Sequence, residues 1–137
     1  MPAKDTYHGA VRNALVKDGW TITHDPFTIA WDERKMYADL GAEQFLAAER
    51  SNRRIAVEIK SFLGKSLLDD LEKALGQFIL YRTILERIEP DREMLLAIPY
   101  DVAVVFNEPL GLLLLESNLI RAFSFDPVQE VIVQWIP

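Results

Sequence analysis

Two hydrophobic periods run along the chain, and each predicts a different kind of element. Apolar residues at helical spacing predict a first helix over 4–18 and a long helix that begins after the capping residue Ser66 and ends before Pro90. Alternating apolar and polar residues predict strands at 20–24, 35–40, 55–60, 94–98, 119–125 and 131–135. Between them we expect a short helix-prone segment at 43–52 ending in a Ser51-Asn52 turn, and one or two short helices over 102–116, broken at Pro109 and Gly111.

The element order α-β-β-β-α-β-α-β-β predicts an α/β fold with a central mixed β-sheet flanked by helices. A chain of 137 residues supports one hydrophobic core, so we expect a single domain over residues 1–137. The last strand alternates Val131, Val133 and Trp135. This alternation fits either a sheet edge packed on the core or a docking strand, and we favour the core.

Composition and charge narrow the function classes. The chain has no cysteine and two histidines, which excludes a disulfide framework and a thiolate zinc site and argues against a histidine zinc site. No secretory signal or membrane-length apolar run is present, so we expect a cytoplasmic protein without a membrane span. The net charge of −6 opposes non-specific binding to nucleic acid, unless basic residues gather away from the acids. Candidates for such a group are Arg50, Arg53, Arg54, Lys60 and Lys65.

The stretch IAVEIK, residues 55–60, carries unexpected charges for a strand with a buried pattern. Side chains alternate along a strand, so Glu58 and Lys60 point to one side and Val57 and Ile59 to the other. Charged side chains are seldom fully buried unless they are paired or bind a metal. We therefore expect this strand to end in a cleft.

A second acid, Asp39, stands near the end of the preceding predicted strand. If the two strands pair, Asp39 and Glu58 converge with Lys60 beside them, and two carboxylates at about 4 Å repel by roughly 4 kcal/mol at an effective dielectric near 20. The site therefore needs a cation or a proton. Mg²⁺ or Mn²⁺, bound by one or both carboxylates, the backbone carbonyl of Ile59 and several waters, would remove this repulsion and activate water for phosphodiester hydrolysis. The plainer alternative is a surface Glu58–Lys60 ion pair on an edge strand, worth about 0–1 kcal/mol.

The long helix adds Gln77 and Tyr81, which are four residues apart and share one side of the helix. An amide and a phenol there could hydrogen-bond a phosphate, a base or the carboxylates around the metal. The alternative is that Tyr81 lies at the rim of the core and Gln77 is solvated.

These residues together resemble the PD-(D/E)XK nuclease superfamily, in the branch with a Q-x-x-x-Y helix. The resemblance covers roughly residues 5–100 and implies a restriction endonuclease-like fold, with Asp39 and Glu58 as metal ligands and Lys60 as a catalytic residue. It also implies a supporting role for His8, on the first helix. Ala38 stands where the motif that names the superfamily has proline, a residue without a chemical role.

A further resemblance spans nearly the whole chain. The segments MPAKDTYHGAVRNALVKDGWTITHDP, YADLGAE, VEIKSFLG, DLEKALGQFILYR and EVIVQWIP are similar to the XisH family, excision controlling factors for the fdxN element. The resemblance implies a role in excising a DNA element, with DNA, an XisI-like protein and a site-specific recombinase as candidate partners. Because the chain has no evident DNA-reading element, we also expect a homodimer or a partner that supplies recognition.

Three functional hypotheses remain open on the sequence alone. The first is a Mg²⁺-dependent endonuclease that uses Asp39, Glu58 and Lys60. The second is a catalytically inactive excision factor that keeps the nuclease fold and binds DNA, a recombinase or an XisI-like protein. The third is an interaction protein in which Glu58 and Lys60 are only an ion pair.

Overall fold

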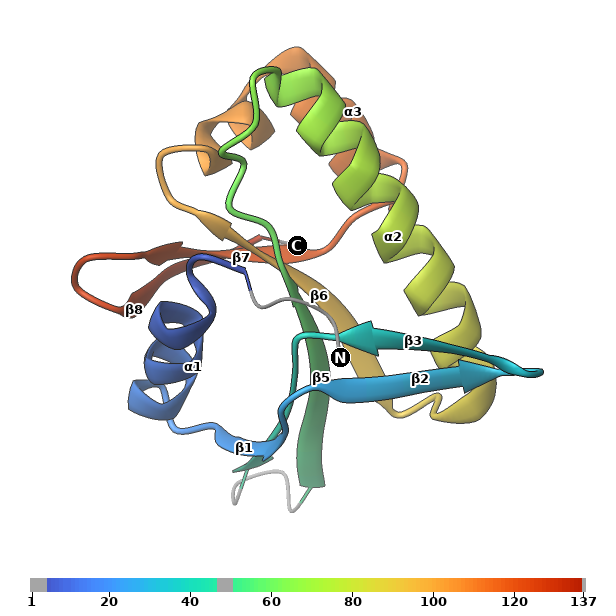
Figure 1. Ribbon diagram of the computed structural model, residues 1–137. Helices are drawn as coiled ribbons and strands as arrows, with labels where there is room; N and C mark the ends of the chain where they lie inside the picture. Colours follow the sequence, from blue (N-terminus) through green and yellow to red (C-terminus); the bar gives the residue numbers. More distant parts are fainter. Residues whose placement is uncertain (1–4, 47–50, 137) are drawn as a thin grey trace.

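A mixed β-sheet forms the centre of the computed structural model, which describes residues 5–46 and 51–136 (Figure 1). Within these residues the main sheet has six strands in the order β1-β4-β5-β6-β7-β8. β5, β6 and β7 run parallel, and the other neighbours pair antiparallel. The strands are β1 (Thr21–His24), β4 (Leu40–Leu46), β5 (Ser51–Ile59), β6 (Arg92–Pro99), β7 (Ala122–Asp126) and β8 (Val131–Ile136). The predicted α/β fold class is confirmed.

Helices cover the two faces of this sheet. α1 (His8–Lys17) packs Val11 and Leu15 on one face, in a core that also contains Val57 and Ile59 of β5. α2 (Leu67–Ile88) packs on the other face, as Figure 1 shows. Both helices were predicted, as was the cap of α2, where the Asp69 N–H donates to Ser66 Oγ at 3.3 Å.

A separate two-stranded ribbon of β2 (Phe27–Trp31) and β3 (Arg34–Ala38) packs into the α2 core through Phe27, Ile29 and Ala38. β2 was not predicted from the sequence, and β3 and the start of β4 were predicted as one strand. The ribbon turns at Asp32, which has a φ of 59°. Asp32-Glu33 lacks the glycine that normally marks such a turn, which explains the omission.

The segment 43–52 was predicted to be helix-prone with a Ser51-Asn52 turn, and this prediction was wrong. β4 continues to Leu46 and β5 begins at Ser51, while residues 47–50 lie outside the described part of the chain. Pairing across the strands, such as Glu43 with Arg54, outweighs the local helix propensity.

The predicted short helices at 102–116 are a 3₁₀ helix, η1 (Ala103–Asn107), and α3 (Pro109–Glu116). Gly111 does not break α3, contrary to the prediction. Its role is close packing, because a Cβ there would lie 2.6 Å from Phe106 Cα in η1. Pro109 opens the helix, where its missing N–H costs nothing.

The preference for a core position for the last strand was also wrong for its alternating residues. Val131, Val133 and Trp135 are 38%, 53% and 38% exposed, and only Ile136 is buried. Within the described sheet β8 is an edge strand with β7 as its one neighbour, so burial reaches it from one side only. Across residues 5–46 and 51–136, no helix has the length and apolar character needed to span a membrane.

Candidate functional site

Strand pairing places the two predicted acidic residues opposite each other. Leu40 pairs with Val57, which puts Asp39 level with Glu58 at the end of the antiparallel ladder. Asp39 is the single residue between β3 and β4, so it lies at a bend and not within a strand. Its Oδ2 accepts a hydrogen bond of 2.7 Å from the Ile59 N–H. The bend therefore directs the Asp39 carboxylate towards the end of β5.

The alternation expected for IAVEIK is present in β5. Val57 and Ile59 belong to the core under α1, and Ala56 belongs to the core under α2. Glu58 shares the α2 side with Ala56 and is only 6% exposed. The Lys60 Nζ atom lies 3.5 Å from Glu58 Oε2. The Glu58–Lys60 pair is therefore not the exposed ion pair on an edge strand that was considered as the alternative. A buried carboxylate with one lysine contact carries a large desolvation cost.

Burial controls the protonation of this pair. It is the main cause that raises the pKa of Glu58 to about 8, followed by repulsion from Asp39, while Lys60 acts in the opposite direction. Burial likewise raises the pKa of Asp39, against the Ile59 N–H and a hydrogen bond with Glu58, which lower it. When both groups are ionised, Glu58 Oε1 is buried without a donor among the described residues. The proton of the pair therefore resides on Glu58, which can donate to Asp39.

The long helix α2 carries Tyr81 within electrostatic range of the two acids and Gln77 one turn before it. Tyr81 is 8% exposed, and its pKa is raised by burial first and then by the charges of Glu58 and Asp39, so its phenol lies within electrostatic range of both acids. Gln77 is half-buried, and its Oε1 atom is buried without a hydrogen-bond partner in the described structure. Tyr81 is therefore buried and not at the rim of the core, and the side chain of Gln77 is not fully solvated.

His8 lies on α1, near enough for a positive imidazole to lower the pKa of Asp39. It is 6% exposed, and its Nε2 atom is 2.8 Å from Asp25 Oδ1. Arg12 holds the other oxygen of Asp25 at 2.5 Å. The Nδ1 atom of His8 is buried and has no partner among the described residues. His8 is therefore held by Asp25 and lies within electrostatic range of Asp39.

Asp39 and Glu58 fit a hard divalent cation. Burial raises the pKa of both carboxyls, so each gains from a partner that stabilises its ionised form, and Glu58 Oε1 and Gln77 Oε1 are buried oxygens without donors among the described residues. Within the described residues no third histidine, aspartate or glutamate completes a cluster. Two carboxylates are enough for Mg²⁺, because this ion is often held by one or two carboxylates and keeps several bound waters. The role of the Ile59 carbonyl remains a prediction.

Comparison with known proteins decides the family. The sequence model of the XisH protein family matches residues 1–133. The chain belongs to the XisH family. Two crystal structures agree with this, an XisH family protein from Nostoc punctiforme PCC 73102 and a protein from Anabaena variabilis described as an fdxN element excision controlling factor. No curated protein matches the chain.

The fold is shared with both XisH structures over their full length. The Nostoc punctiforme protein is 38% identical, with 97% of this chain and 100% of that chain covered, at a TM-score of 0.85. The Anabaena variabilis protein is 39% identical, with coverage of 98% and 100% and a TM-score of 0.85. The six-stranded sheet and the helices that position Asp39 and Glu58 therefore fall within the part shared with XisH proteins.

Two residues of this XisH chain were not predicted from the sequence: Asp25, which contacts His8, and Arg12, which contacts Asp25. Asp25 was used only as a strand breaker before Pro26. The one signal available was that Arg12 and His8 are four residues apart on the predicted helix, a spacing that places both on one side. Their shared partner comes from a different element, and the sequence gives no spacing for it.

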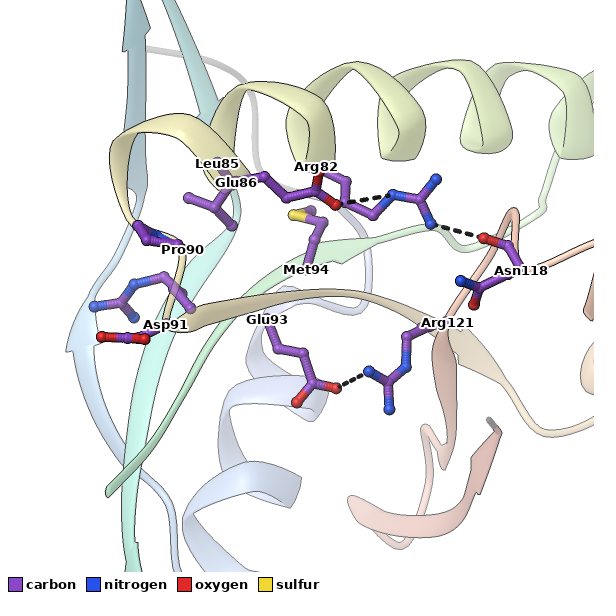
Figure 2. Close-up of a pocket in the computed structure, with 10 residues that line it drawn as sticks. Arg82, Leu85, Glu86, Pro90, Asp91, Glu93, Met94, Asn118 and Arg121 are labelled. Carbon is purple, nitrogen blue, oxygen red and sulfur yellow. Dashed lines mark hydrogen bonds and ion pairs between the residues drawn. The ribbon is translucent and has the colours of Figure 1, made fainter. Parts of the chain in front are cut away.

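A pocket of about 370 Å³ lies elsewhere in the XisH chain, between the end of α2 and the start of β6 (Figure 2). The pocket is distant from Glu58 along the sheet. Arg92, which lines the pocket, is level with Arg54 of β5, and Arg54 is four residues, or about 13 Å, along the strand from Glu58. Acidic and basic residues that line the pocket form ion pairs, Arg121 with Glu93 at 2.7 Å and Arg82 with Glu86 at 3.9 Å. The pocket is thus separate from the acidic pair and has no excess of either charge.

Proposed function

We propose that this XisH family chain is a Mg²⁺-dependent endonuclease of the PD-(D/E)XK type that hydrolyses phosphodiesters during excision of a DNA element. The observation that supports this proposal most strongly is the register that sets Asp39 level with Glu58, with Lys60 Nζ 3.5 Å from Glu58 and Tyr81 within electrostatic range of both acids. The fdxN excision role named for the Anabaena variabilis relative gives the DNA context.

In this proposal each residue has a separate task. Asp39, held by the Ile59 N–H, and Glu58, once deprotonated, hold the cation together with the Ile59 carbonyl. The bound cation supplies an activated water and offsets the charge that develops on the phosphate. Lys60 lies beside Glu58, where its amine can orient the attacking water or donate to the phosphate oxygens. Gln77 and Tyr81 hydrogen-bond the carboxylates or the substrate, and His8 supports the site from α1.

The second candidate is a non-catalytic excision factor on the same fold, and the charge distribution favours it. The net charge is −6, and two arginines considered for a DNA surface are already paired, Arg53 with Glu93 and Arg54 with Glu43, each at 3.3 Å. Exposed ion pairs of this kind leave little positive potential for phosphates. In either case an XisI-like protein, a site-specific recombinase or a second copy in a homodimer would supply DNA recognition.

A cleavage assay separates the two candidates. The purified chain is incubated with single- and double-stranded DNA in Mg²⁺, in Mn²⁺ and in a chelator, and the products are resolved on a gel. The nuclease proposal expects cleavage with either metal and its loss in Glu58→Gln and Lys60→Met. Glu43→Gln is the matched control, because it also neutralises a strand glutamate in an ion pair, at a site remote in register from Glu58.

Only variants that circular dichroism shows to be folded are compared in the cleavage assay. Absence of cleavage with both metals, together with normal cation binding, would favour the non-catalytic factor. Equal cleavage by wild type and Glu58→Gln would show that the activity does not come from this site.

A further inference from the structure

The outer face of α3 is apolar and exposed. The helix has the sequence PLGLLLLE, with Leu110, Leu112 and Leu113 exposed by 45%, 45% and 57%. Gly111 and Leu114 are buried on its inner side, so the exposed leucines are not needed to attach the helix to η1 and the core. A surface helix normally carries polar residues on this side. We name Leu110, Leu112 and Leu113 the α3 leucine face.

Acidic residues flank the α3 leucine face. Glu108 precedes the helix and Glu116 ends it, and Asp101 stands just before η1; all three are exposed. None of the three forms an ion pair with another described residue. The sequence contains no lysine or arginine between Glu93 and Arg121. The leucines are thus accompanied by negative charge that the chain itself does not neutralise.

The two arginines that lie next to the end of α3 in the chain or in space are already paired. Arg82 Nη1 donates to the Asn118 carbonyl, just beyond the end of α3, at 2.9 Å, and its Nε lies 3.9 Å from Glu86. Arg121 is paired with Glu93 (Figure 2). Both arginines belong to the pocket at the far end of α2, and their charges are matched there by acids.

We propose that the α3 leucine face binds a partner protein whose contact surface combines apolar side chains with flanking lysines or arginines. Complementary charge guides such a partner, and burial of the leucines supplies the affinity. A second copy of this chain would bring Glu108 and Glu116 against the same acids, so a homodimer would use another surface. Nucleic acid and anionic bilayers would meet the same repulsion.

This inference does not depend on cleavage activity. An acidic chain that acts on DNA needs a basic partner to reach the polyanion, whether or not the chain cuts it. The α3 leucine face lies on α3, whereas Asp39 lies between β3 and β4 and Glu58 lies on β5, so binding and cleavage can be tested with different variants.

The test uses the full chain and a fluorescent amphipathic helical peptide of leucine and lysine, with a leucine–glutamate peptide of the same pattern as the charge control. Binding is followed by fluorescence anisotropy. We expect the lysine peptide to bind and Leu113→Asp to weaken it at least about tenfold, because one buried leucine side chain contributes that much. The added negative charge would attract this peptide, so a loss reports the apolar contact.

Val128→Asp is the matched control, since Val128 is an exposed apolar residue at 83% in the β7–β8 turn. It introduces the same charge and should leave binding unchanged. Glu108→Gln with Glu116→Gln should weaken binding severalfold and reduce its salt dependence.

Three results would overturn the proposal. In the first, Leu113→Asp and Val128→Asp bind the lysine peptide equally well. In the second, sedimentation shows a wild-type dimer that Leu113→Asp dissociates, which assigns the face to a second copy. In the third, vesicles of anionic lipid bind the wild type but not Leu113→Asp, which assigns it to a membrane surface.

Discussion

Replacing Glu58 with glutamine should change how the stability of the metal-free protein depends on pH. In the folded chain the pKa of Glu58 is about 8, against an ordinary value of 4.5, mainly because the carboxyl is buried. The folded state therefore keeps a proton that the unfolded state releases as the pH rises above 4.5. The stability that Glu58 contributes is fully present below that pH and is lost as the pH rises through about 8.

The size of the effect follows from the two pKa values. The interval from 4.5 to about 8 corresponds to about 5 kcal/mol at roughly 1.4 kcal/mol per pH unit. That amount is a large part of the 5–15 kcal/mol that stabilises a typical domain. Glutamine keeps the shape of the side chain and cannot ionise, so Glu58→Gln should remove this pH-dependent loss.

Urea denaturation in a chelator, at steps from about pH 5 to about pH 8, measures the free energy of unfolding directly. The difference between Glu58→Gln and wild type should grow in favour of the variant by several kcal/mol across this range. Glu43→Gln should follow the wild-type curve, because the Glu43 carboxylate is 34% exposed beside Arg54. Parallel curves for Glu58→Gln and wild type would refute the argument that burial raises the pKa of Glu58.

Two further predictions concern the cation and the packing of α3. In thermal scans, Mg²⁺ or Mn²⁺ should raise the melting temperature of the wild type more at about pH 8 than at about pH 6, because the cation competes with the Glu58 proton. Asp39→Asn should abolish this rise. A rise of the same size in Asp39→Asn would contradict the assigned ligands. Gly111→Ala should lower the free energy of unfolding, measured in urea, by about 1–3 kcal/mol, since its Cβ would lie 2.6 Å from Phe106 Cα. Gly76→Ala is the control: a Cβ there meets nothing within 4 Å, so this change should stabilise α2 by about 0.5–1 kcal/mol. Equal effects of the two substitutions would disprove the packing role of Gly111.

Local features of the sequence predicted the parts of the fold that local chemistry determines. The alternation around Glu58 placed Val57 and Ile59 on the opposite face from the acid, and Ser66 marked the start of α2. The pairing of Glu43 with Arg54 could not be predicted in the same way, because it is a contact between strands that overrides helix propensity. β2 was missed for a related reason, since Asp32 makes the left-handed turn without a glycine signal.

The candidate site shows the same division. Asp39, Glu58 and Lys60 could be proposed from residue type and spacing, and strand pairing then brought the two acids level. Burial could not be proposed, because it depends on Tyr81 and the rest of the α2 core closing over the strand. The Asp25 contact to His8 likewise joins two elements whose relative position only the folded chain defines.

The two acids differ in how the protein holds them, and this difference explains why protons and cations compete at one of them. Asp39 accepts a 2.7 Å hydrogen bond from the Ile59 N–H, which stabilises its charged form and fixes its position without a cation. Glu58 has the Lys60 contact at 3.5 Å and a hydrogen bond with Asp39 that it can make as the protonated partner, and its Oε1 atom has no donor among the described residues. The proton therefore resides on Glu58, and a cation that binds both carboxylates must displace it. Cation affinity should consequently rise with pH until Glu58 is ionised.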